Sequence, residues 1–207
     1  MKTIIKSTFL LSFFLISFSV KSQSQEEMIT NSNNLTNAQV QLQTDSLNVE
    51  SLYVAGKACY NLKRYDESKA YLEKALKLDH SNPKIPYYLA LINARERAYQ
   101  SADGYFEQAH VVLNDQSGLD LDSFYFLWAT NSLKNKDYPK AIAHFTYSIE
   151  YDPGNSLSFL NRGICQGKSG KLKEGCQDFK SAYDLGDDKA KDLIIKYCPV
   201  TKNELGF

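Results

Sequence analysis

Histidine is the side chain best suited to acid–base catalysis near neutral pH, and it occurs three times in this chain of 207 residues. His80 falls in a turn between repeated segments, whereas His110 and His144 fall in helical segments of two different repeats. No pair has the short spacing that a shared metal ion requires. The histidines therefore predict no metal centre and no catalytic base.

Three aspartates, Asp115, Asp120 and Asp122, resemble a cation-binding loop, because carboxylates are preferred Ca²⁺ ligands. They lack the EF-hand spacing and its closing glutamate, so a solvated loop is favoured. The chain also lacks a phosphate-binding glycine motif and a nucleophile elbow. We therefore expect no enzyme and no cofactor.

Four cysteines supply the remaining reactive groups. Cys59 falls on the apolar side of an expected helix and is interpreted as a small core residue. Cys165, Cys176 and Cys198 lie near the C-terminal end, and none of them forms a C-x-x-C motif. A structural disulfide among these three is one interpretation. A reactive thiolate at Cys165 or Cys176, as in an enzyme or redox protein, is a weaker one.

The first 22 residues have the pattern of a secretory signal peptide. Lys2 and Lys6 precede an apolar run of about 12 residues, and small residues favour cleavage after Ser22. The run is shorter than the ~20 residues that span a bilayer, so we expect export to the periplasm or beyond, without membrane insertion. Cleavage would remove three lysines, leaving 24 − 3 = 21 basic and 24 acidic residues. This near-neutral charge does not favour nucleic acid binding.

Four columns of similar residues recur along the chain, at steps of 34, 39 and 34 residues. A period of this length is typical of repeats that stack as helical hairpins. Small residues let two helices approach, and large apolar residues fill the space between them. The columns are a first small one, Gly56, Ala90, Ala129 and Gly163; a bulky one, Tyr65, Tyr99, Tyr138 and Leu172; a second small one, Ser68, Ala102, Ala141 and Gly175; and a large one, Leu72, Phe106, Phe145 and Phe179.

The period divides the chain into segments. A flexible start and a lead-in helix are expected over 23–48, and five inserted residues at 117–121 form a surface loop. A last helix should cover the terminal repeat, whose apolar face would otherwise be exposed. The predicted segments are a signal peptide at 1–22, repeats at 49–82, 83–116, 122–155 and 156–188, a cap at 188–198 and a tail at 199–207.

These columns resemble the helix-packing positions of the tetratricopeptide repeat family over about residues 49–188. The resemblance implies an all-α fold, a right-handed α-solenoid of helix-turn-helix repeats with a C-terminal capping helix. Arg162 departs from the pattern, since its slot is usually apolar. The last repeat and its closing helix are similar to exported bacterial members, which implies a disulfide between Cys176 and Cys198.

The family holds partner segments in a groove formed by its first helices. The resemblance and helical phase together predict an aromatic column with basic residues alongside, suited to an acidic peptide. An alternative is that these aromatic residues pack between repeats. Tyr53 and Lys57 replace the Lys and Asn of chaperone-binding members, so chaperone tails are not expected. The predicted groove comprises Tyr53, Lys57, Tyr60, Asn61, Tyr87, Leu91, Arg95, Phe126, Thr130, Lys134, Leu160, Ile164 and Lys168.

The sequence thus favours a non-enzymatic scaffold or adaptor of the cell envelope that binds another protein. The alternative is a self-assembling structural solenoid, because repeat arrays with an imperfect cap stack end to end.

Overall fold

The computed structural model describes residues 2–114 and 116–198, with side chains from residue 23 onward. Within these residues the secondary structure is entirely helical, which confirms the predicted all-α class. The helices are α1 (Lys2–Thr44), α2 (Val49–Asn61), α3 (Tyr65–Leu78), α4 (Lys84–Arg95), α5 (Tyr99–Val111), α6 (Leu121–Lys134), α7 (Tyr138–Tyr151), α8 (Ser156–Lys168), α9 (Leu172–Asp184) and α10 (Asp188–Tyr197).

The small and large columns pack the two helices of each hairpin together. A Cβ atom on Gly56 would lie 2.6 Å from Leu72 Cγ, and one on Gly163 would lie 2.8 Å from Phe179 Cδ1. Gly175 is equally constrained, because its Cβ would lie 2.8 Å from the Gly163 carbonyl oxygen. Any larger side chain at these glycines must push the helices apart.

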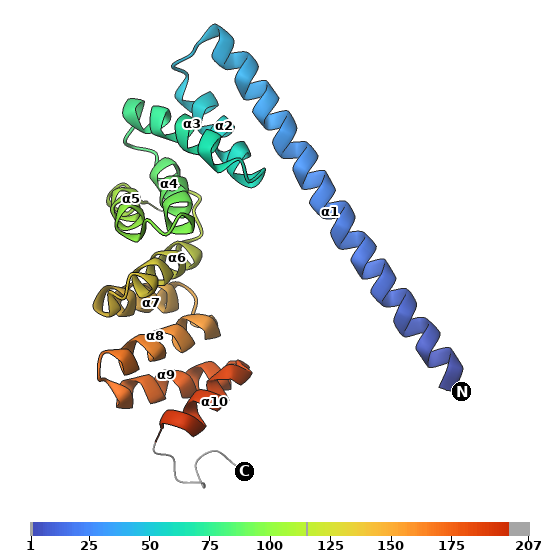
Figure 1. The fold of residues 1–207 in the computed structure, drawn as a ribbon, viewed down its shortest axis with the longest axis vertical. Coiled ribbons are helices and arrows are strands. Elements are labelled where there is room, and N and C mark those ends of the chain that lie inside the picture. Colours follow the sequence, from blue (N-terminus) through green and yellow to red (C-terminus); the bar gives the residue numbers. More distant parts are fainter. Residues whose placement is uncertain (1, 115, 199–207) are drawn as a thin grey trace. The chain divides into compact units, whose positions relative to one another are not determined.

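The chain forms two compact units, residues 1–81 and 82–207. In the first, α1 packs on α2 through the buried residues Leu35 and Ala38 and the half-buried Leu42 (Figure 1). The Asn61 side-chain amide donates to Asn31 Oδ1 at 2.9 Å and extends this contact. The lead-in helix is therefore present. Residues 23–34, predicted to be flexible, are also helical, since they continue α1.

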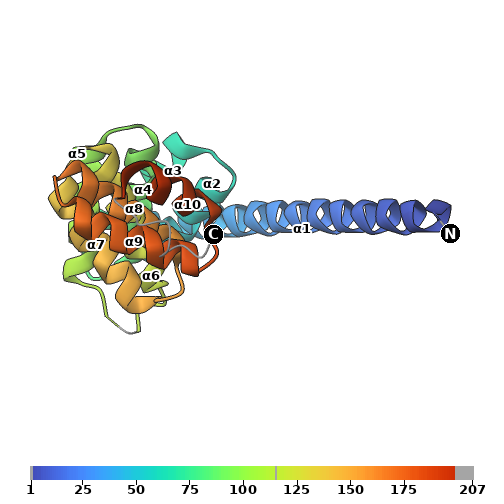
Figure 2. The same cartoon turned by 90° about the horizontal axis from the view of Figure 1, so that it is seen from below.

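The second unit contains α4 to α10, arranged as successive antiparallel pairs with α10 beside α9 (Figures 1 and 2). Ala190 and Ile194 of α10 are buried against Leu160, Phe179 and Ala182. The last helix therefore covers the apolar face of the final hairpin, as predicted for a cap. Residues 117–120 of the predicted inserted loop 117–121 are non-helical and lie between α5 and α6, whereas Leu121 is already the first residue of α6.

Several predicted features lie outside the described residues. These are the side chains of the signal segment 1–22, Asp115 of the inserted loop and the tail 199–207. Across the described part of the chain, none of the helices combines the length and apolar character that crossing a bilayer requires.

Candidate functional site

The predicted aromatic column lies largely inside the hairpin packing. Tyr53 is only 8% exposed and Leu160 only 6%. Tyr87 is half-buried, and its ring centroid lies 5.9 Å from that of Phe124, while Phe126 lies 5.7 Å from Phe145. The column is therefore buried at Tyr53 and Leu160 and half-buried at Tyr87 and Phe126. The prediction that these four residues line an open groove is wrong for Tyr53 and Leu160, and Tyr87 and Phe126 are chiefly packing residues.

In the first unit, the other predicted groove residues of α2 have different surroundings. Lys57 is exposed, and Tyr60 is half-buried with its ring edge-on to Tyr65 at 5.7 Å. Asn61 is exposed but already bonded to Asn31 of α1. Only Lys57 therefore presents an exposed charge where the sequence predicted one.

In the second unit, α4, α6 and α8 each end with an exposed basic residue in the last turn. These residues are Arg95, Lys134 and Lys168. A cation at this position is favoured by the helix dipole. The remaining predicted residues of these helices, Leu91, Thr130 and Ile164, are half-buried.

Arg95 and Lys134 border an open hollow of about 620 Å³ in the second unit. Its other lining residues are Ala94, Arg97 and Tyr99. Three positive side chains thus meet at one concavity whose lining contains no acidic residue. Since like charges repel, the site gains most from a ligand that brings negative charge.

Acidic residues are scarce on the first helices of the second unit. In α4, α6 and α8 the only one is Asp122. Its carboxylate accepts hydrogen bonds from the Ser148 hydroxyl and, at 3.1 Å, from the Asn155 side-chain amide. Asp122 is therefore engaged by Ser148 and Asn155, and it does not line the basic hollow.

Sequence reasoning missed residues adjacent to the predicted ones. Arg97 lines the hollow although it belongs to the interhelical turn and lies outside the helix face considered. Its basic side chain, two positions after Arg95, was the available signal in the sequence.

Burial suppresses the ionisation of His144 and of the two free cysteines, Cys59 and Cys165. Burial lowers the pKa of His144 to about 4, and its ring stacks on Trp128 at 3.8 Å. Burial also raises the pKa of the Cys165 thiol to about 12 and raises that of Cys59, so neither forms a thiolate readily. No group of three or more metal-ligating side chains occurs among the described residues.

Cys176 and Cys198 form a disulfide with a Cα–Cα distance of 5.7 Å. It ties the second turn of α9 to the residue after α10, which fastens the capping helix to the last hairpin. This is the pair that the resemblance implied. It also removes Cys176 as a free reactive thiol.

Helical hairpins with repeated packing columns and a closing helix define an α-solenoid repeat protein. Residues 49–82 match the family model described as tetratricopeptide repeat. Solved structures have a similar fold. The crystal structure of MamA superposes with a TM-score of 0.66, at 22% identity, over 76% of this chain and 89% of that one. Together these findings show that residues 49–82 form a tetratricopeptide repeat and that the chain has the α-solenoid fold of tetratricopeptide repeat structures.

Two further similarities are informative. The structure described as "YrrB: a TPR protein with an unusual peptide-binding site" superposes with a TM-score of 0.68, at 21% identity, over 81% of this chain and 84% of that one. The Hsp70-Hsp90 organizing protein of Triticum aestivum is 26% identical over 142 residues, 68% of this chain. The chain spans about a fifth of the length of such curated relatives.

Proposed function

We propose that this protein is a non-enzymatic adaptor that binds an acidic segment of another protein on α4, α6 and α8. The hollow lined by Arg95, Arg97 and Lys134 is the observation that carries the proposal. Repeat arrays of this kind provide extended binding surfaces, and the fold is shared with a structure described as peptide-binding. Half-buried Leu91 and Thr130 lie four residues before Arg95 and Lys134, so each shares a helix face with one of these cations.

The proposed partner is not a chaperone tail, although the curated relatives are named for Hsp70 and Hsp90. Tyr53 and Lys57 occupy the positions where the resemblance would require Lys and Asn. Tyr53 is also largely buried, so it cannot reach a ligand without repacking. The cations of the second unit instead form a separate site.

We further propose that the protein works after export, in the cell envelope. The signal-like residues 1–22 support this. The disulfide between Cys176 and Cys198 supports it too, because such bonds persist mainly in oxidising compartments. N-terminal sequencing of the exported protein tests the proposal, and a chain that still begins at Met1 contradicts cleavage.

A charge-reversal experiment tests the binding site. The probe is a fluorescent peptide of alternating glutamate and leucine, with its lysine counterpart as the reverse-charge control. We expect Arg95→Glu combined with Lys134→Glu to weaken acidic-peptide binding at least tenfold, and added salt to weaken binding to the unchanged protein. The matched control reverses Lys173 and Lys180, two exposed cations of α9 away from the hollow. Equal binding by both double variants would place the site elsewhere.

A further inference from the structure

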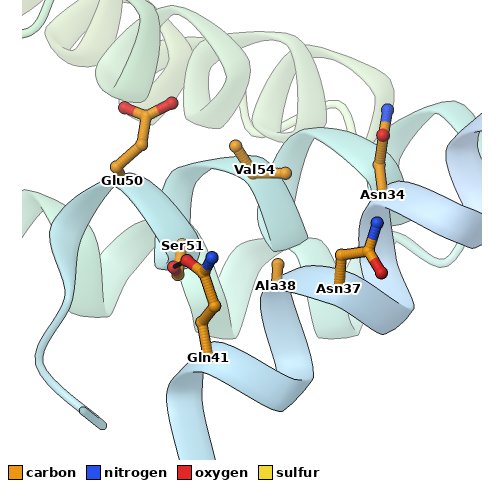
Figure 3. Close-up of a pocket in the computed structure, with 7 residues that line it drawn as sticks. All are labelled: Asn34, Asn37, Ala38, Gln41, Glu50, Ser51 and Val54. Carbon is orange, nitrogen blue, oxygen red and sulfur yellow. Dashed lines mark hydrogen bonds between the residues drawn. The ribbon is translucent and has the colours of Figure 1, made fainter. Parts of the chain in front are cut away.

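A second hollow, of about 190 Å³, lies in the first unit between α1 and α2 (Figure 3). Asn34 and Asn37 of α1 stand at one end of it, and Glu50 of α2 stands at the other (Figure 3). Ala38 and Val54 lie between these ends. The hollow is therefore elongated, with neutral amides, an apolar middle and a single negative charge.

The side-chain amides of Asn34 and Asn37 can form hydrogen bonds with a ligand. Among the described residues, neither Asn34 nor Asn37 has a side-chain hydrogen-bond partner, and both are exposed. A carboxamide can donate to a peptide carbonyl and accept from a peptide N–H at the same time. Asn34 and Asn37 lie three residues apart on one helix, so both can face the same ligand backbone.

The wall of the hollow is fixed by hydrogen bonds between the two helices. The Ser51 hydroxyl donates to Gln41 Oε1 at 2.8 Å, which holds the Gln41 side chain across the α1–α2 contact. Ser51 is itself placed at the start of α2, where its backbone N–H donates to Asn48 Oδ1 at 2.9 Å. The hollow is thus formed before any ligand arrives, which lowers the entropic cost of binding.

We infer that this hollow binds a lysine or arginine side chain of an extended partner segment. The aliphatic stem would cover Ala38 and Val54, as long basic side chains cover apolar surface elsewhere. The cationic head would pair with Glu50, and the segment's main chain would bond to Asn34 and Asn37. This inference rests on the proposed function only in taking the ligand to be a protein segment. Its charge preference is opposite to that of the hollow in the second unit.

Two features of α2 bear on this assignment. Glu50 lies in the first turn, where a carboxylate is favoured by the helix dipole without any ligand. That preference explains an acid at this position, but it does not explain the two amides at the opposite end of the hollow. Lys57 is seven residues further along α2, a rise of about 10 Å, and is not among the lining residues. Its charge is therefore too distant to neutralise Glu50 directly.

The test is a titration of the isotope-labelled full chain, followed by backbone amide NMR shifts. The probe is an acetylated, amidated alanine tetrapeptide carrying one lysine, and its control carries norleucine instead. We expect shifts confined to residues 34–41 and 50–54 for the lysine peptide, and little response to norleucine. Glu50→Gln should weaken binding about two- to fivefold, as expected for one exposed ion pair. The matched control, Glu73→Gln on α3, should leave it unchanged.

A charge swap gives the sharpest outcome. With Glu50→Lys, a glutamate tetrapeptide should bind better than the lysine peptide. Equal response to lysine and norleucine, no shifts, or shifts at other residues would each overturn the inference. The Arg95→Glu and Lys134→Glu changes should not affect lysine-peptide binding, so failure here and failure of the proposed function are distinguishable.

Discussion

At the scale of single residues, one slot of the repeat shows how an exceptional side chain is accommodated. Trp128 and Arg162 occupy the same slot 34 residues apart, and each meets the residue 16 positions further on. Trp128 stacks on His144, whereas the Arg162 guanidinium donates two bonds of 2.7 Å to Asp178. The departure at Arg162 therefore has a compensating partner, and the side chain of Asp178 is only 7% exposed.

The Arg162–Asp178 pair gives the first prediction. Asp178→Ala should destabilise the protein by about 3 kcal/mol, because it leaves the Arg162 charge largely buried and unpaired. Urea unfolding followed by circular dichroism measures the change. The double variant Arg162→Leu with Asp178→Leu should recover much of the loss, since it removes both charges. A double variant less stable than Asp178→Ala would show that the packing of these two side chains contributes more to stability than their ion pair does.

His144 gives a prediction about pH. Its folded pKa of about 4 lies below the ordinary value of 6.5, so unfolding takes up a proton between these two pH values. Stability should therefore be lost as pH falls from 6.5 towards 4, by up to about 1.4 kcal/mol per pH unit from this group. His144→Phe keeps a ring against Trp128 and should flatten the dependence. Parallel curves for both proteins would assign the acid sensitivity to other groups.

At the scale of elements, two glycines should respond oppositely to the same substitution. Gly170, in the turn between α8 and α9, has a φ of +79°, and no atom lies within 4 Å of an added Cβ. Gly104 is inside α5 and is equally free of neighbours. Gly170→Ala should cost about 1 kcal/mol for the left-handed backbone, whereas Gly104→Ala should add about 1 kcal/mol by helix propensity. Thermal melts of the two variants check the signs, and shifts of equal sign would refute the conformational argument.

The disulfide is the other element-scale feature with a measurable effect. It closes a loop across 22 residues, so replacing both Cys176 and Cys198 by serine should cost about 3 kcal/mol. Loss of helicity should begin in α10, which depends on this bond and on Ile194 for attachment. Hydrogen exchange of α10, compared with α4, checks the location. An equal loss of hydrogen-exchange protection in α10 and α4 would mean that the disulfide stabilises the whole second unit.

The repeat columns could be predicted from sequence because a fixed period aligns residues that make the same contact in every hairpin. The closing helix could be predicted because the last repeat would otherwise expose its apolar face. The extent of α1 could not be predicted, because residues 23–34 are polar. The buried Asn31 bonds to Asn61, a partner 30 residues away that local spacing does not reveal. The burial of Tyr53 and Leu160 could not be predicted, because helical phase alone does not say how deeply neighbouring helices cover a side chain.

At the scale of the whole molecule, the cap decides between an adaptor and a self-assembling array. Exposed lysines, Lys189 and Lys196, lie on the outer side of α10, which opposes stacking of copies through this end. Ile195, 62% exposed, is an apolar exception there. We therefore expect the disulfide-bonded protein to scatter light as a monomer whose mass does not depend on concentration.

Displacing the cap should reverse this behaviour. Ile194→Asp places a carboxylate where the side chain is 4% exposed, so α10 should detach and uncover Phe179 and Leu160. The apparent mass should then rise with concentration, because a second copy of the protein can cover the exposed apolar face of the hairpin. Ile195→Asp, on the outer side of the same helix, is the matched control and should remain monomeric. Concentration-dependent mass in the unchanged protein would favour the structural solenoid over the adaptor.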